Sequence, residues 1–211
     1  MFLSKIDINI SDKEVIYNLK NSNFWHKQIM SGFDEHFIPS SDARKGLDIL
    51  HRKEESMNNL YFLVQSIVQP NWYGKSWVKN AQVKCLDDIV NSFVVGKVMN
   101  FDVLCSPYYT QYSINEKTGK MKGRRRFFKT DEEKLNWLKE KEKYNGFELI
   151  GCNVVKTNRT ITNIKEQNIK PIYLTNFIGT LRITDVEKFK TFYSNGVGPH
   201  KAYGAGMIML Y

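Results

Sequence analysis

The order of predicted strands and helices in the second half of this 211-residue chain limits its fold more than any other feature. Residues 98–105 alternate between polar and apolar side chains, which is typical of a half-buried strand. Thr130 followed by Glu133 forms a capping box, so a helix is expected to begin there. The expected series is a strand at 98–105, a helix at 131–144, strands at 147–155 and 172–183, a helix beginning at 184–185 and a strand at 207–210. This strand-helix-strand-strand-helix-strand order is typical of a ferredoxin-like domain.

The first half predicts a similar but less complete series. A strand at 3–10 is followed by a helix that begins at Ser11–Asp12 or at Ser22–Asn23 and runs to about Met30. Strands at 46–52, 59–66 and 81–86 come next. We therefore predict an α+β protein with two tandem ferredoxin-like (RRM-like) domains that contain antiparallel sheets, at residues 1–96 and 97–211. The chain is long enough for two domains of roughly 100 residues each.

Charge is distributed unevenly between these two halves. The chain carries 31 Lys and Arg against 22 Asp and Glu, a net charge of +9. Residues 1–96 hold 11 of each sign, so the whole excess lies in residues 97–211, with 20 basic and 11 acidic residues. We expect the basic half to face a polyanion, either nucleic acid or an anionic membrane surface. A solvated basic surface that only aids solubility is the simpler alternative.

Several classes of protein are disfavoured by what the sequence lacks. No window reaches 18 apolar residues, so no membrane span is expected, and the first ten residues do not resemble a signal peptide. Cys85, Cys105 and Cys152 are far apart and form no CxxC pair, so neither a zinc ribbon nor a disulfide framework is expected. We therefore predict a cytoplasmic protein with no membrane association, no metal and no cofactor.

The strongest motif is a glycine-rich stretch near the C-terminus, GVGPHKAYGAG at residues 196–206. Glycines let backbone amides approach a phosphate closely, and a lysine adds a point charge. The stretch is neither a P-loop nor a Rossmann fingerprint, because it lacks GxxxxGK[ST] and a strand-loop-helix setting. A phosphate-contacting loop and a glycine-rich turn before a strand both fit the sequence. The candidate contact residues are Gly196, Gly198, His200, Lys201, Gly204 and Gly206.

This loop and several other segments together resemble a known family. The other matching segments are residues 1–5, 63–66, 70–72, 129–138, 146–147 and 177–183. In combination they resemble the CasE family of type I-E CRISPR systems, the endoribonucleases that cut CRISPR precursor RNA. The resemblance covers nearly the whole chain, and the glycine-rich loop by itself is specific only to the wider superfamily of repeat-associated RNA-binding proteins.

The resemblance implies metal-independent cleavage at the repeat hairpin. The ribose 2′-OH next to the scissile phosphate attacks in line and leaves a 2′,3′-cyclic phosphate and a 5′-OH. This chemistry needs an acid/base group with a near-neutral pKa and donors that stabilise developing charge. His26 stands where the family carries its catalytic histidine, and Lys27 beside it can stabilise that charge. Asn23 stands where the family often has a tyrosine.

Two alternatives remain open at this point. A second alignment of the helix matches Tyr17 to the family tyrosine but puts Lys20 in the histidine position, and we prefer the first. The Asn23 substitution also leaves room for a non-catalytic subunit of the same fold that only binds repeat RNA. A general DNA-binding or membrane-surface protein ranks lower, because the chain lacks a helix-turn-helix signature and a basic amphipathic helix.

The resemblance further implies that the second half binds the CRISPR repeat RNA hairpin and that the protein joins the other Cascade subunits with its product. A β-hairpin of the second domain would lie along the RNA stem. Its predicted contact residues are Lys156, Arg159, Lys165 and Lys170. A basic loop over 115–126, which includes Arg124, Arg125 and Arg126, is expected to bind RNA or a neighbouring protein, or to be solvated. His36 and His51 lack a motif context and are expected to be surface or packing residues.

Overall fold

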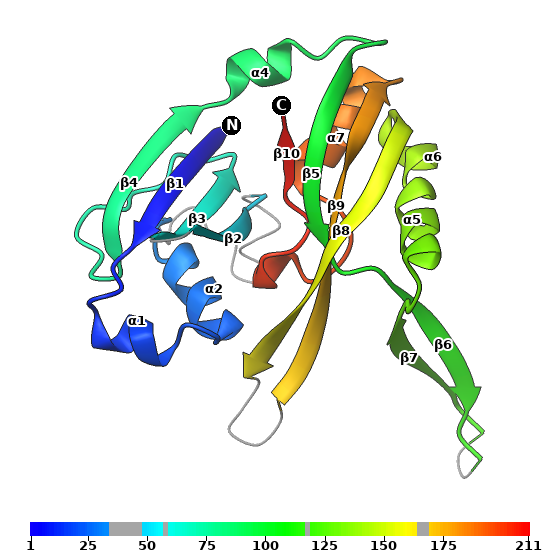
Figure 1. Cartoon of the computed structure of the whole chain (residues 1–211), viewed down its shortest axis with the longest axis horizontal. Helices are drawn as coiled ribbons and strands as arrows, with labels where there is room; N and C mark the ends of the chain where they lie inside the picture. The colour runs from blue at the N-terminus through cyan, green and yellow to red at the C-terminus, as the bar shows by residue number, and fades with distance from the viewer. Residues whose placement is uncertain (34–47, 57–58, 117–118, 164–168) are drawn as a thin grey trace.

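The computed structural model describes residues 1–33, 48–56, 59–116, 119–163 and 169–211. These residues form two four-stranded antiparallel sheets that lie side by side, together with a separate two-stranded hairpin (Figure 1). No helix in the described part of the chain is both long and apolar enough to cross a membrane.

The first sheet combines four strands from the first half in the order β2-β3-β1-β4, which is a ferredoxin-like order. Two short helices follow β1 and pack against one face of this sheet, where Trp25 lies 4.9 Å from Phe62 between ring centroids. The elements are β1 (Phe2–Ile8), α1 (Lys13–Tyr17), α2 (Ser22–Met30), β2 (Leu50–Ser56), β3 (Asn59–Ser66) and β4 (Val78–Cys85).

The second sheet has the equivalent order, β10-β5-β9-β8, and helices complete its strand-helix-strand-strand-helix-strand series. Its core is built from apolar residues of the sheet and of the last helix, with Phe177 and Phe189 fully buried. The predicted α+β fold with two ferredoxin-like units is thus confirmed. The elements are β5 (Val98–Cys105), α5 (Asp131–Lys139), α6 (Glu142–Asn145), β8 (Phe147–Asn163), β9 (Ile169–Ile183), α7 (Val186–Asn195) and β10 (Ile208–Leu210).

Helix boundaries follow the capping residues. Asp12 and Asn21 each accept backbone hydrogen bonds at a helix start. The alternative that begins at Ser22 gives the helix that ends at Met30, and the start at Ser11–Asp12 begins a separate short helix. Thr130 and Glu133 form the predicted capping box at the start of α5. The helix predicted over 131–144 is interrupted after Lys139, and α6 ends at Gly146 with a φ of 69°.

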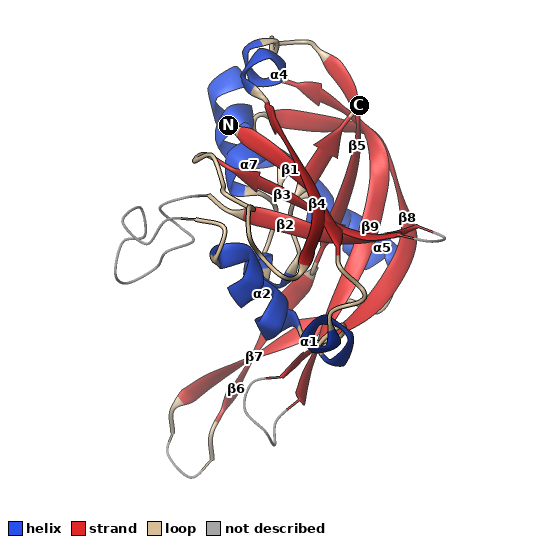
Figure 2. Ribbon diagram, turned by 90° about the vertical axis from the view of Figure 1, so that its left-hand side faces the viewer, coloured by secondary structure: helices blue, strands red, loops and turns tan. Residues whose placement is uncertain are grey.

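The prediction that residues 115–126 form a loop is wrong. Residues 121–126 of this segment are strand: β6 (Tyr108–Ile114) and β7 (Met121–Phe127) pair as an antiparallel hairpin that belongs to neither large sheet. The polar and basic residues suggested a loop, but they are compatible with a strand because both faces of this hairpin are open to solvent beyond its base. Figures 1 and 2 show this hairpin and the β8–β9 hairpin extending from the body on the same side of the molecule.

Three predictions fall on residues outside the described part of the chain: His36, Lys165 and the start of the strand expected at 46–52. The short helix α4 (Asp87–Asn91) lies between the two sheets in sequence, and its neighbours Leu86 and Phe93 pack into the core of the second sheet. The boundary at residue 96 stays a prediction.

Polar contacts hold the two halves against each other. Arg52 of β2 donates to Asp102 of β5, with Nη1 to Oδ1 at 2.5 Å and Nη2 to Oδ2 at 3.4 Å. Gln65 donates to the backbone carbonyl of Tyr193 at 2.9 Å, and both side chains are buried. Arg52 is buried and Asp102 is partly exposed, and Arg52 also pairs with Glu54 of its own strand, so carboxylates from both halves compensate its charge. These contacts fix the relative position of the groups that line the space between the sheets.

Candidate functional site between the two sheets

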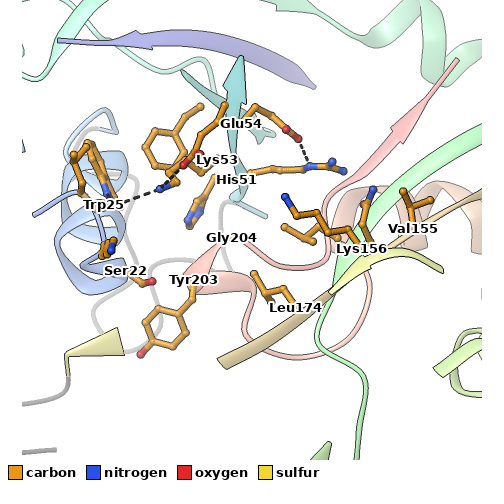
Figure 3. Close-up of a pocket in the computed structure, with 17 residues that line it drawn as sticks. Ser22, Trp25, His51, Lys53, Glu54, Val155, Lys156, Leu174, Tyr203 and Gly204 are labelled. Atoms are coloured by element: carbon orange, nitrogen blue, oxygen red, sulfur yellow. Dashed lines mark hydrogen bonds and ion pairs between the residues drawn. The ribbon is translucent and has the colours of Figure 1, made fainter. Parts of the chain in front are cut away.

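A cavity of about 620 Å³ lies between the two halves of the protein (Figure 3). Helix α2 and strand β2 form one wall, and strands β8 and β9 with the glycine-rich stretch form the other. A volume of this size is typical of a small-molecule or nucleotide site. The charged and polar residues that line it are Lys20, Ser22, His51, Arg52, Lys53, Glu54, Glu55, Lys156, Asn176 and Tyr203.

His51 lies near the middle of this cavity, between Trp25 and Ser22 of α2 on one side and Lys156 of β8 on the other (Figure 3). Its exposed fraction is only 3 %, and its ring centroid is 5.9 Å from that of Phe62. Of the two alternatives expected for His51, a surface residue or a packing residue, the structure supports packing. The cavity places an imidazole, the side chain that titrates nearest to neutral pH, among several lysines.

Strand β2 buries residues on both of its faces, which explains the position of His51. The register pairs His51 with Val64 and Leu50 with Gln65, so neighbouring residues of β2 point to opposite sides. His51 points to the α2 side, whereas Leu50 and Arg52 point to the second half of the chain. A strand between two partners loses the alternation that reveals a buried residue, and His51 was missed in the sequence for this reason.

His26, the predicted acid/base residue, lies on α2 one helical turn after Ser22, which lines the cavity. Its side chain is half-buried, as is that of Asn23, while Lys27 is exposed. Cα atoms of α2 lie within 8 Å of Cα atoms in the 3₁₀ turn η2 (Lys201–Tyr203) and in β8. Helix α2 and the glycine-rich stretch are thus neighbours, whereas His26 is not among the residues that line the cavity.

The cavity lining does not decide between the two alignments of the helix, because His26, Asn23 and Lys27 of the first alignment are not among the lining residues either. Lys20, which takes the histidine position in that alignment, lines the cavity. Tyr17, which takes the tyrosine position, is 90 % exposed and is not among the lining residues. The two residues of that alignment are therefore not brought to one site.

The glycines of the C-terminal stretch are required by its backbone. Gly196 and Gly206 have φ angles of 69° and 89°, and a Cβ at Gly196 would lie 2.6 Å from the carbonyl oxygen of Gly206. The Val197 amide donates to that same oxygen at 2.8 Å, and the Gly206 amide donates to the Leu104 carbonyl at 2.7 Å. The glycine-rich turn before a strand, one of the two structures that fit the sequence, is therefore present. Gly198 and Gly204 also have positive φ, and Gly204 faces His51.

His200 faces the β6–β7 hairpin rather than the cavity. Its Nδ1 is 3.0 Å from Oγ of the buried Ser106, and its Nε2 is 3.4 Å from Nη1 of Arg125. Burial, with a smaller contribution from the nearby Arg125 charge, lowers the pKa of His200. A neutral ring that donates from Nδ1 and accepts at Nε2 satisfies both partners. His200 has a φ of 63°, which is uncommon for a residue with a side chain.

The predicted basic contact residues are distributed over three places. Lys156 lines the cavity, whereas Arg159 and Lys170 belong to the far parts of strands β8 and β9, opposite Tyr173 and Thr162. Arg124, Arg125 and Arg126 follow one another on β7. Within the described residues there is no group of three or more His, Cys, Asp and Glu side chains that could hold a metal ion.

Comparison with known proteins identifies the family. The sequence pattern of the CRISPR associated protein family matches residues 1–211. This chain belongs to that family. No curated protein matches the sequence closely enough to count as a relative.

Solved structures of CRISPR-associated proteins share the fold. A CRISPR endoribonuclease Cse3 bound to a 19-nucleotide RNA is similar over 100 % of both chains, with a TM-score of 0.77 and 20 % identity. Thermus thermophilus Cse3, bound to an RNA that represents a pre-cleavage complex, gives a TM-score of 0.75 at 20 % identity over 100 % of this chain and 98 % of that one. Cas6e from Escherichia coli str. K-12 gives 0.71 at 20 % identity with the same coverage. At these identities the likeness establishes the fold of this CRISPR-associated protein.

Proposed function

We propose that this protein is an endoribonuclease that cuts precursor CRISPR RNA at the repeat hairpin. The observation that carries the proposal is the cavity between the sheets, where His51 and three lysines lie beside the glycine-rich stretch and the helix of His26. The fold is similar over its whole length to structures described as a CRISPR endoribonuclease bound to RNA and as a pre-cleavage complex. The net charge of +9 favours a polyanionic substrate.

The reaction we propose needs no metal. The 2′-oxygen forms a bond to phosphorus while the bond from phosphorus to the 5′-oxygen breaks, giving a 2′,3′-cyclic phosphate and a 5′-OH. A base removes the 2′-OH proton and an acid supplies a proton to the 5′-oxygen. His26 is our candidate for acid/base transfer, Asn23 for orienting the substrate and Lys27 for charge stabilisation. Lys20 and Lys156 in the cavity add further positive charge near the phosphate, whereas Nζ of Lys53 is paired with Oε1 of Glu55 at 3.3 Å.

We also propose that the two halves divide the work. Residues 1–96 would form the domain that carries the catalytic helix, and residues 97–211 the domain that grips RNA through β8–β9 and the glycine-rich stretch. Retention of the cut RNA within a larger Cascade assembly is supported by likeness to a subunit of a CRISPR RNA-guided surveillance complex, with a TM-score of 0.69 at 21 % identity over 100 % of this chain and 99 % of that one. A cytoplasmic location is expected for such an assembly.

A second candidate function is a subunit of the same fold that binds repeat RNA without cutting it. One observation favours it: Asn23 stands where the family often has a tyrosine. An amide cannot take part in proton transfer as a phenol can, so the site would have one titratable group fewer.

The test is incubation of the full-length protein with repeat RNA in EDTA. We expect cleavage by the wild type, none with a 2′-deoxy nucleotide at the cut position, and little with His26→Ala. Cleavage that persists with the 2′-deoxy RNA would contradict 2′-OH attack, and cleavage that persists in His26→Ala would assign the acid/base role to another residue, with His51 the first to examine. Tight binding of an RNA that stays intact would favour the non-catalytic candidate.

A further inference from the structure

The β6–β7 hairpin, called the arm below, is a structural unit of its own. It consists of the paired strands β6 and β7, which pair with neither four-stranded sheet. In both views it projects from the body (Figures 1 and 2). Every described residue of the arm from 109 to 126 is exposed, so its two faces are available to bind other molecules.

The register of the two strands sorts the arm's side chains into two different faces. Residues directly opposite in an antiparallel pair share a face, and the faces alternate along each strand. One face contains Tyr108, Thr110, Tyr112 and Ile114 opposite Phe127, Arg125, Gly123 and Met121. The other face contains Tyr109, Gln111, Ser113 and Asn115 opposite Arg126, Arg124, Lys122 and Lys120.

The first of these faces is turned toward the body, and we call it the inner face. Arg125 lies 4.9 Å from the ring centroid of Tyr108 and 3.4 Å from Nε2 of His200 in the glycine-rich stretch. Phe127 packs against Tyr173 of β9 with ring centroids 4.8 Å apart. The inner face therefore continues the surface formed by the glycine-rich stretch and the long β8–β9 hairpin.

The opposite, outer face carries a row of cations. Arg126 donates from Nε to Oε1 of Gln111 at 2.9 Å, which places both side chains on this face as the register requires. The row of Lys120, Lys122, Arg124 and Arg126 occupies alternate positions, about 6.8 Å apart along a strand. The paired positions of this face include no carboxylate, and the one acidic side chain that the structure describes beside the row is Glu116, which lines a surface pocket together with Lys122 and Arg124. The three neighbouring arginines that look like one cluster in the sequence thus belong to two sites: Arg125 to the inner face, and Arg124 and Arg126 to the outer.

We propose that this outer row binds the phosphate backbone of a single-stranded RNA segment that adjoins the repeat hairpin. Evenly spaced cations on an exposed strand, with amide and hydroxyl groups opposite, suit a backbone that carries one charge per nucleotide. A protein partner is less well matched, because apart from Tyr109 the face has no large apolar side chain for a buried contact. The proposal rests on the proposed function for the identity of the RNA, but it does not depend on cleavage.

The experiment compares two RNAs and three variants in salt titrations of binding. One RNA is the repeat hairpin alone, and the other carries a single-stranded flank of about ten nucleotides, within the roughly 4–16 that one single-strand site occupies. The outer variant is Arg124→Gln/Arg126→Gln and its inner counterpart is Arg125→Gln. The matched control removes two exposed lysines of β4, Lys79→Gln/Lys84→Gln. The quantity of interest is the affinity that the flank adds.

We expect the outer variant to reduce the flank's contribution by about tenfold. The salt slope on the flanked RNA should become shallower by about 1.4, because each cation that neutralises a phosphate of a single strand contributes about 0.7 to the slope. Arg125→Gln should weaken both RNAs alike and leave the flank's contribution in place, and the β4 control should change neither. Changing the base sequence of the flank should not alter the result.

Two outcomes would overturn the proposal: an outer variant that weakens the binding of both RNAs equally, or one that, like the β4 control, weakens the binding of neither. A wild-type protein that binds the repeat hairpin no better than a scrambled RNA would contradict the proposed function instead. The outer row could then still be tested with the single-stranded RNA alone, because its predicted effect does not require the hairpin.

Discussion

The two four-stranded sheets share one strand order but differ in the segment that leads to their last strand. In the second half, helix α7 crosses from β9 to β10 and buries Phe189 and Phe192. In the first half, residues 67–77 connect β3 to β4, and this fully described segment contains no helix. Trp72 and Trp77 from this connection fill the core in its place, with ring centroids 5.9 Å apart, and Trp72 Nε1 donates to Ser4 Oγ at 2.9 Å.

The two halves also differ in what they offer a ligand. The neutral first half supplies the short helix α2 and the buried His51, both held by a dense aromatic core. The basic second half supplies features that reach outward, namely the long β8–β9 hairpin and the arm. The difference suggests that one copy of the fold specialises in placing chemical groups and the other in gripping a polyanion. A variant in one half of the chain should therefore leave the activity, RNA affinity or stability that depends on the other half unchanged.

The largest effect is expected from His26→Ala in the first half. Removal of a general acid/base group costs about 10²–10⁴-fold in rate. We expect a loss of this size in single-turnover cleavage, with RNA affinity within about twofold of the wild type, because the binding surface is assigned to the second half. Rapid-quench cleavage and filter binding on the same preparations measure the two quantities.

If His26→Ala also loses RNA affinity, this result would contradict the assignment of catalysis to the first half and RNA binding to the second. His51→Asn serves as the comparison, because His51 lines the cavity whereas His26 is not among its lining residues. If the asparagine variant loses more activity than His26→Ala, the acid/base role belongs to β2 rather than α2.

Next in size is the loss of stability expected from Trp72→Ala. Trp72 is 5 % exposed, and its ring packs so close to Gly32 that a Cβ there would lie 2.0 Å from it. Truncation of a buried aromatic residue typically costs about 3–5 kcal/mol, and Phe189→Ala in the other half should cost a similar amount. Urea unfolding monitored by circular dichroism checks both. A cost below about 1 kcal/mol for Trp72→Ala alone would show that the connection does not replace the missing helix.

The fold was predictable because its strands have a clear pattern. Strand β3 matches its predicted bounds, 59–66, because it is a run of apolar residues in the middle of a sheet, and β5 matches 98–105, because its buried residues alternate. Helix starts were predictable wherever a side chain caps the backbone, as at Thr130 and Asp185. The arm was not predictable in this way, because a hairpin without a core has no strong apolar alternation.

The candidate site was predictable only in part. The family resemblance indicated α2 and the glycine-rich stretch as candidate site elements, and the structure places the two close together. His51 could not be found, because its burial depends on contacts between β2, α2 and Gly204 that are far apart in sequence. The split of Arg124, Arg125 and Arg126 between two faces required the strand register, which a run of three like residues does not reveal.

A smaller effect is expected from Lys156→Gln in the second half. Lys156 is exposed and lines the cavity. If its ammonium group contacts a phosphate, the variant should bind repeat RNA about fivefold more weakly, with a salt slope shallower by about 0.7–0.9. Lys84→Gln on β4 of the first half is the matched control and should change neither value. Equal effects of the two lysines would mean that affinity depends on total charge and not on the basic half.

The smallest effect concerns His200, which joins the glycine-rich stretch to the base of the arm within the second half. Burial and then Arg125 lower the pKa of His200 in the folded protein relative to about 6.5 in the unfolded chain. The unfolded chain therefore binds more protons between these two values, so this contribution to stability is complete above about pH 6.5 and is lost as the pH falls through the folded pKa. Thermal unfolding at pH 7.5 and pH 5.5 should show a larger decrease for the wild type than for His200→Asn, a residue that tolerates a positive φ. Because His200 belongs to the second half, Trp72→Ala should leave this pH dependence in place. An equal decrease in the wild type and His200→Asn would assign the pH dependence to another group.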